Sequence, residues 1–111
     1  MIKEEEIAKK CIELWGNKDQ IRQCIEECSE LITVLAKYGR NVNGSTDDDI
    51  VTEIADVEIM CKQMRLIFGE HRTSIEKQAK LEKLNTRVDR ESQFKARELS
   101  FKSPLEYPKE G

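Results

Sequence analysis

The sequence predicts an all-α protein, a four-helix bundle that is completed by oligomerisation. Charged side chains make up 37% of the 111 residues and aromatic ones only 5%, which suits helices and argues against a β-rich fold. Both prolines, Pro104 and Pro108, lie in the last eight residues, so no proline breaks a helix before them. Apolar side chains recur at helical spacing in four stretches, and the length corresponds to one domain.

Glycines bound the first two predicted helices. The first covers about residues 4–15 and ends at Gly16. The second covers about residues 19–38, and Gly39 fits its C-terminal cap. The apolar face of this second helix consists of Ile21, Cys24, Ile25, Cys28, Leu31, Ile32 and Leu35.

The third predicted helix follows a polar loop. Ser45 or Thr46 is its N-cap, and the three aspartates in its first turn interact favourably with the positive end of the helix dipole. The helix stops at Gly69. Its main apolar stripe consists of Ile50, Ile54, Val57, Met60, Cys61, Met64, Ile67 and Phe68. Ile59 and Leu66 form a second apolar patch opposite this stripe, so we expect a homo-oligomer, either a dimer or a dimer of dimers.

The fourth predicted helix has a weaker apolar stripe that includes Leu81, Leu84 and Val88. It runs from Thr73 or Ser74 to about Arg90. We therefore assign residues 1–91 to a helical domain. Residues 92–111 are expected to form a C-terminal tail that is flexible or contacts a partner.

Two acidic clusters carry most of the functional information. The first is Glu26-Glu27-Cys28-Ser29-Glu30, and the second, after 22 further residues, is Glu53-Ile54-Ala55-Asp56. Each cluster gathers its carboxylates on one part of a helix surface. If the two helices pack face to face, four or five carboxylates converge and repel one another unless hard cations such as Mg²⁺ lie between them.

Glu53 makes this argument stronger, because it falls inside the apolar stripe of the third helix, with Asp56 at its edge. A carboxylate on a buried face is costly unless it is protonated or finds a compensating charge. The nearest cationic residues, Lys62 and Arg65, point away from that face. The first cluster alone is typical of a solvated face, so the metal-site prediction depends on the pair.

The composition also excludes several classes of function. No apolar run approaches the 18 residues of a membrane span, and the acidic N-terminus is unlike a signal peptide, so we expect a cytoplasmic protein. Residues 1–69 carry 9 basic and 14 acidic side chains, a poor balance for binding nucleic acid. The four cysteines lie at apolar helical positions, so we expect them to be reduced, buried thiols.

The two clusters and their flanks resemble the MazG-like all-α nucleoside triphosphate pyrophosphohydrolases, whose signature is Glu-Glu-x-x-Glu followed by Glu-x-x-Asp. The segments Ile25–Ile32 and Glu53–Met60 are similar to helices of small members common in phages and Gram-positive bacteria, as are Trp15-Gly16 and Lys80–Leu84. The resemblance covers about residues 10–90. It implies a catalytic domain that hydrolyses a nucleoside triphosphate, which we expect to be a dNTP, to the monophosphate and pyrophosphate. The role would be control or housecleaning of the nucleotide pool.

The resemblance also implies roles for individual residues. The family's metal ligands correspond to Glu27, Glu30, Glu53 and Asp56, which would hold Mg²⁺, with Mn²⁺ able to substitute. Glu26 matches the leading glutamate of the motif and would orient or deprotonate a water molecule.

Candidate substrate contacts lie on the first two helices. Lys37, two turns beyond Glu30, reaches a phosphate or is simply a solvated lysine. Gln20 and Gln23 precede Glu27 by two turns and one turn, where they suit hydrogen bonds to a base edge. Trp15 either stacks on a base or fills the core. Gln63, two turns after Asp56, is a more distant candidate.

Other functional classes fit the sequence less well. A non-catalytic helical interaction or scaffold module would leave the carboxylates facing solvent and be insensitive to Mg²⁺. A di-iron carboxylate bundle needs Glu-x-x-His motifs, and His71 has Phe68 three residues before it. The run Asp47-Asp48-Asp49 lacks the alternating ligands and central glycine of an EF-hand.

Overall fold

The computed structural model describes residues 1–101, and these residues form four helices without a strand. The helices are α1 (Glu4–Trp15), α2 (Asn17–Lys37), α3 (Asp47–Phe68) and α4 (Glu70–Phe101). The predicted all-α class is therefore confirmed. The chain divides into two compact units, of which the first, Met1–His71, contains α1 to α3 and the second begins at Arg72, within α4.

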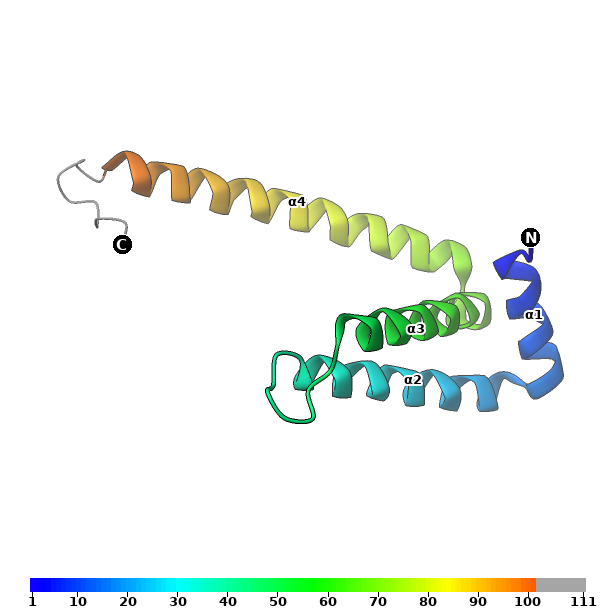
Figure 1. Ribbon diagram of the computed structural model, residues 1–111. Coiled ribbons are helices and arrows are strands. Elements are labelled where there is room, and N and C mark those ends of the chain that lie inside the picture. Colours follow the sequence, from blue (N-terminus) through cyan, green and yellow to red (C-terminus); the bar gives the residue numbers. More distant parts are fainter. Residues whose placement is uncertain (102–111) are drawn as a thin grey trace. The chain divides into compact units, whose positions relative to one another are not determined.

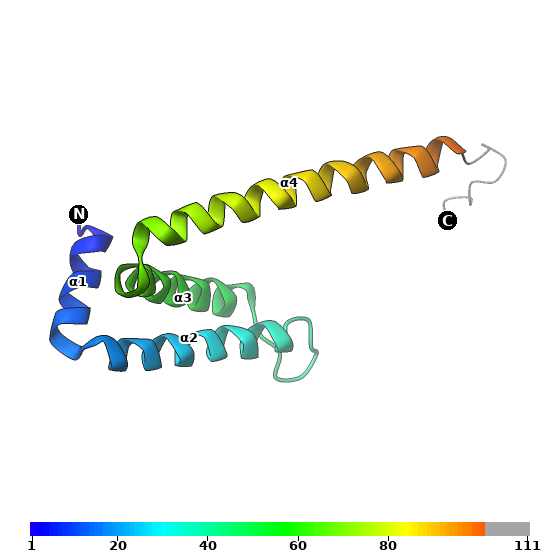
Figure 2. The ribbon, with the colours of Figure 1, turned by 180° about the vertical axis from the view of Figure 1, so that it is seen from behind.

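In the first unit, α2 and α3 lie side by side and run in opposite directions (Figure 1). The same pairing is seen from behind in Figure 2, where α1 lies at the end of the pair at which α2 begins. The shorter α1 packs on both longer helices. This arrangement makes the contact between α2 and α3 the main internal surface of the unit.

Local chemistry fixes the two ends of α3. The hydroxyl of Thr46 accepts a hydrogen bond from the backbone N–H of Asp49 at 3.2 Å, and the Asp49 carboxylate accepts one from the N–H of Thr46 at 2.9 Å. This capping box satisfies two backbone donors, and it identifies Thr46 rather than Ser45 as the N-cap. At the other end Gly69 adopts a φ of 135°, which ends the helix where the sequence predicts.

The loop between α2 and α3 depends on a close backbone approach at Gly44. A Cβ atom at this position would lie 2.3 Å from the carbonyl oxygen of Arg40. No side chain fits there without moving the backbone. The loop therefore holds the end of α2 and the start of α3 in a defined turn.

The interior of the first unit is small and unusually polar. Two buried apolar residues, Ala8 and Met60, accompany two buried amides, Gln20 and Gln63. The predicted apolar face of α2 is only partly covered, since three of its members, Ile25, Ile32 and Leu35, are exposed. The reason is that α3 packs along the border between the apolar and acidic faces of α2, which turns Glu27 inward.

Helix α4 differs from the prediction at both ends. It begins at Glu70, directly after Gly69, and continues to Phe101 instead of ending near Arg90. The carboxylate of Glu70 lies 2.8 Å from the Lys62 ammonium group and also binds the Arg65 guanidinium, which anchors the first turn. No glycine or proline interrupts the chain between Glu70 and Phe101, so the helix has no internal stop signal.

The predicted boundary at residue 91 lies within this helix, so the expected tail is helical over residues 92–101. Residues 102–111 lie outside the described part, and the domain assignment stays a prediction. Among the described residues, no helix has the length and apolar character required to cross a membrane.

Candidate metal centre and adjoining cleft

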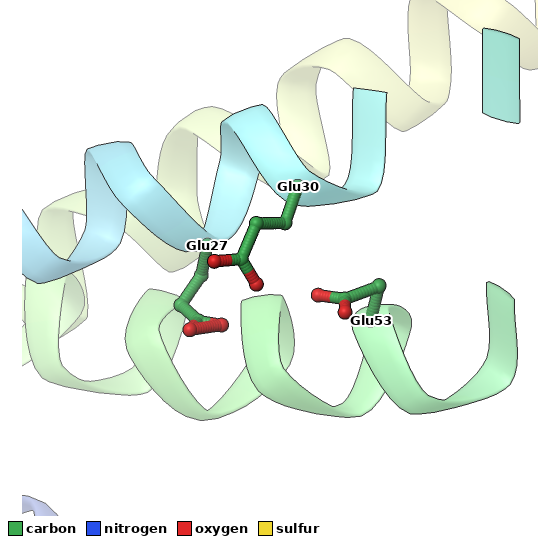
Figure 3. A group of neighbouring side chains, drawn as sticks. All are labelled: Glu27, Glu30 and Glu53. Carbon is green, nitrogen blue, oxygen red and sulfur yellow. The ribbon is translucent and has the colours of Figure 1, made fainter. Parts of the chain in front are cut away.

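Three carboxylates meet between α2 and α3. Glu27 and Glu30 extend from α2 and Glu53 from α3, and their carboxylates point toward a common space (Figure 3). One oxygen from each residue lies within 4.8 Å of the others. The two acidic clusters, which the sequence separates by 22 residues, are thus brought together by the antiparallel pairing of the helices.

Two of these carboxylates have buried oxygens without a partner. Oε2 of Glu27 and Oε2 of Glu53 are buried and form no hydrogen bond with the described residues. The other oxygen of Glu27 accepts a hydrogen bond from Gln23 Nε2 at 3.3 Å. A buried acceptor without a donor is unfavourable. Binding of a proton or a cation by these two oxygens would therefore stabilise the site.

The electrostatics of the cluster point the same way. Burial raises the pKa of Glu53, and the neighbouring charges of Glu30, Asp56 and Glu27 raise it further. Burial likewise raises the pKa of Glu27, and nearby Glu30 and Asp56 add to the rise. Deprotonation of these groups is therefore opposed by the fold unless positive charge enters the cluster.

Asp56 and Glu26 border this cluster without joining the group of three. Asp56 is half-buried on α3 and acts on both Glu27 and Glu53 through its charge. Glu26 is exposed on α2. The nearby cations are engaged elsewhere, because Lys62 lies 3.4 Å from Glu5 as well as binding Glu70. Lys62 and Arg65 thus bind carboxylates outside the cluster, Glu5 and Glu70.

The donor set fits a hard divalent cation. Mg²⁺ binds through carboxylate oxygens and retains several waters, and the three converging groups offer only oxygen ligands. The orphaned oxygens of Glu27 and Glu53 are the specific observation in favour of this fit. Two or three negative charges in one space also give the compensation that a divalent ion requires.

A cleft of about 640 Å³ adjoins the cluster. Its wall includes Glu26 and Gln23, and Gln23 also holds Glu27 through the hydrogen bond described above. The complete lining is Cys11, Trp15, Asp19, Gln20, Arg22, Gln23, Glu26, Met60 and Gln63. The cleft therefore receives residues from all three helices of the first unit.

The structure gathers most of the predicted substrate contacts in this cleft. Gln20, Gln23 and Trp15 all line it. Trp15 is 55% exposed, so its side chain does not serve as core filling. Lys37 is half-buried at the last turn of α2 and is not part of the cleft wall. Along α2, the acidic cluster thus lies between the cleft and Lys37.

The burial of Gln63 is the main feature that the sequence argument undervalued. Gln63 is 2% exposed, and its Oε1 is buried without a hydrogen-bond partner among the described residues. The register of the antiparallel helix pair could have predicted the position of Gln63. Glu30 lies near Glu53, and continuing the antiparallel pairing along both helices brings Gln20 and Gln63 to the same cleft.

The cysteines are free thiols, as expected. Burial raises the pKa of Cys24 to about 11, and its neighbour Cys28 adds to this rise. Desolvation also raises the pKa of Cys61. The predicted full burial of the cysteines is wrong, because Cys11, Cys24 and Cys28 are half-buried and Cys61 is exposed. Protonated thiols are poor nucleophiles and poor metal ligands, so Cys24 and Cys61 are unsuited to compete with the carboxylates for a cation.

Comparisons with protein-family models, with curated proteins and with solved structures found no match for this chain.

Proposed function

We propose that this protein hydrolyses a nucleoside triphosphate to the monophosphate and pyrophosphate with the help of Mg²⁺. The observation that carries the proposal is the meeting of Glu27, Glu30 and Glu53 from two helices, with two orphaned buried oxygens among them. A solvated acidic surface has no reason to bury carboxylate oxygens without partners. A cation site does.

The residues of the site would have different roles. Glu27, Glu30 and Glu53 would hold the cation, and Asp56 adds negative charge beside them. Mg²⁺ would supply charge neutralisation for the phosphate oxygens and make water easier to deprotonate. Glu26 borders the cleft next to the cluster, where its carboxylate would orient or deprotonate the attacking water. Phosphoryl transfer needs mainly positioning and charge neutralisation, so no covalent nucleophile is required.

The adjoining cleft supports a nucleotide rather than a simple phosphate ester as the substrate. It offers an exposed aromatic ring, Trp15, beside two amide side chains, Gln20 and Gln23. An aromatic face suits stacking of a base, and amides suit hydrogen bonds to its edge. With the base in the cleft and the phosphates at the carboxylates, Lys37 lies beyond the cluster, where it would meet the far end of the triphosphate.

A homo-oligomer is part of the same proposal. A groove of about 400 Å³ lies along α2 and reaches Met64 of α3. Its lining is almost entirely apolar and includes Ile21, Ile25 and Ile32. Exposed apolar surface of this kind is characteristic of protein interfaces. We propose a dimer or a dimer of dimers as the functional form, which sedimentation or mass photometry would establish.

A second candidate function is a non-catalytic helical interaction module. The observation in its favour is the series of exposed apolar side chains on α4, among them Leu81, Leu84 and Val88. Such a module would show no response to Mg²⁺ and no turnover. Its carboxylate cluster would have only a structural role.

The test is pyrophosphate release from a panel of canonical and modified NTPs and dNTPs, with Mg²⁺ and with EDTA. We expect release that depends on Mg²⁺, with loss of activity in Glu53→Gln. The matched control is Glu58→Gln, which removes the same charge from an exposed position of α3 and should retain activity. Absence of turnover of every nucleotide by folded protein would favour the interaction module.

A further inference from the structure

We infer that Gln63 is the specificity-determining residue of the cleft, and that its Oε1 accepts a hydrogen bond from an N–H group on the edge of a nucleobase. The inference deepens the proposed function, on which it rests for the choice of a nucleotide as ligand. It starts from one unusual feature of the molecule: Gln63 lines a cleft, and its buried amide oxygen has no hydrogen-bond partner among residues 1–101.

The burial of Gln63 needs an explanation. Its side chain is 2% exposed, and a glutamine at such a position would ordinarily be replaced by an apolar residue or be fully hydrogen-bonded. An unpaired buried acceptor destabilises the fold. A ligand that supplies the missing donor removes this cost, because the orphaned oxygen then gains its hydrogen bond in the bound state.

The position of Gln63 defines the kind of ligand. On α3 it lies ten residues beyond Glu53 and seven beyond Asp56, or about 15 Å and 10 Å along the helix axis. A nucleotide whose phosphates lie at the carboxylates therefore has its base, and not its sugar or phosphates, at the level of Gln63. Gln20 faces the same cleft from α2 and is itself only 6% exposed.

The chemistry of the surrounding wall agrees with an aromatic, hydrogen-bonding ligand. Trp15 supplies a ring, and Met60 is a buried apolar contact. Two buried amides on opposite helices supply both donors and acceptors. Nucleobases combine a flat aromatic surface with such groups on the edge. A base whose edge N–H is replaced by N–CH₃ should lose the bond to Gln63 and leave its oxygen unpaired again.

The experiment compares matched nucleosides that differ only in this N–H group. The pairs are uridine with 3-methyluridine, and adenosine with N6,N6-dimethyladenosine. Binding is followed through the fluorescence of Trp15, which lines the cleft and is the single tryptophan of the chain. We expect at least one parent nucleoside to bind about tenfold to hundredfold more tightly than its methylated partner, since an unpaired buried acceptor carries a cost of that order.

The Gln63→Leu variant separates hydrogen bonding from steric exclusion. Leucine has a similar volume and no polar atoms, so a methyl group that merely clashes would still be excluded. We expect the discrimination to fall to about threefold or less and the melting temperature of the free protein to be unchanged or raised, because the orphaned oxygen is gone. The control is Gln78→Leu on α4, an exposed position that should leave discrimination unchanged.

Several outcomes would overturn the inference. They are equal binding of both members of each pair, discrimination that persists in Gln63→Leu, or no binding of any nucleoside at millimolar concentration. Pyrophosphate release by the wild-type protein is measured in parallel. If Mg²⁺-dependent release occurs and the role of Gln63 fails, the proposed function stands without it. If release is absent but the expected discrimination is seen, the cleft binds nucleobases and the hydrolytic proposal fails.

Discussion

Replacing Glu53 with glutamine should reverse the order of thermal stability between variant and wild type when Mg²⁺ is added. The pKa of Glu53 is raised by burial and by Glu30, Asp56 and Glu27. The folded protein therefore binds this proton more tightly than the unfolded chain does, and stability falls as the pH rises through the raised pKa. At pH 7.5 in EDTA the charged carboxylate destabilises the fold, so Glu53→Gln should melt at the same temperature or higher.

When Mg²⁺ is added, the melting temperature of the wild type should rise more than that of Glu53→Gln. At ten times its dissociation constant, a ligand that binds only the folded state adds about 1.4 kcal/mol to the free energy of unfolding. For a domain of about 60–100 residues this corresponds to a rise of roughly 6–11 °C in Tm. One oxygen of Glu53 lies within 4.8 Å of its two neighbours, so the variant loses one of three ligands and should gain markedly less.

The assay is thermal unfolding followed by circular dichroism in EDTA, in MgCl₂ and in NaCl of equal ionic strength. The NaCl series is needed because screening alone relieves repulsion between carboxylates. Glu58→Gln is the matched control and should respond to Mg²⁺ like the wild type. The reasoning is refuted if Mg²⁺ and NaCl have the same effect on the wild type. A large drop in the Tm of Glu53→Gln in EDTA would show instead that this carboxylate is structural.

Three further outcomes are expected. Asp56→Asn should lower pyrophosphate release at least tenfold while circular dichroism shows an unchanged helical fold, and full activity would exclude Asp56 from the site. Gly44→Ala should lower the free energy of unfolding by more than about 1 kcal/mol in urea titrations, since the new Cβ would meet the Arg40 carbonyl; an unchanged midpoint would contradict this. The pKa of Glu70 is lowered by hydrogen bonds from Lys62 and Arg65. Its contribution to stability should be complete above its ordinary value of 4.5 and be lost as the pH falls below it, so Glu70→Gln should flatten the acid limb of a Tm–pH curve.

The sequence was informative about the helices because their signals are local. Capping signals and glycines act through a few neighbouring residues, which is why the start of α3 could be narrowed to Ser45 or Thr46 and its end placed at Gly69. The end of α4 was predicted wrongly, near Arg90 instead of Phe101. The sequence contains no proline or glycine between Glu70 and Phe101, so no such stop signal lies near Arg90.

The candidate site was predictable in its composition and less so in its geometry. Acidic residues three and four positions apart gather on one side of a helix whatever surrounds them, so the candidate carboxylates could be named from the sequence. From the sequence, these carboxylates were expected to converge only if the two helices pack face to face. The structure meets this condition for Glu27, Glu30 and Glu53, while Asp56 lies beside the group.

What the sequence by itself determined is therefore the all-α class, the borders of α1 and α3, and the identity of the clustered carboxylates. Helix α2 begins at Asn17, two residues before the predicted start. Only the tertiary structure decided which side of α2 faces α3. That choice turned Glu27 inward, left Ile25 and Ile32 exposed, and buried Gln63 in the wall of a cleft. The physical reason is that helical periodicity fixes the relative angles of side chains around one axis, whereas the rotation of one helix against another is set by packing between residues far apart in the chain.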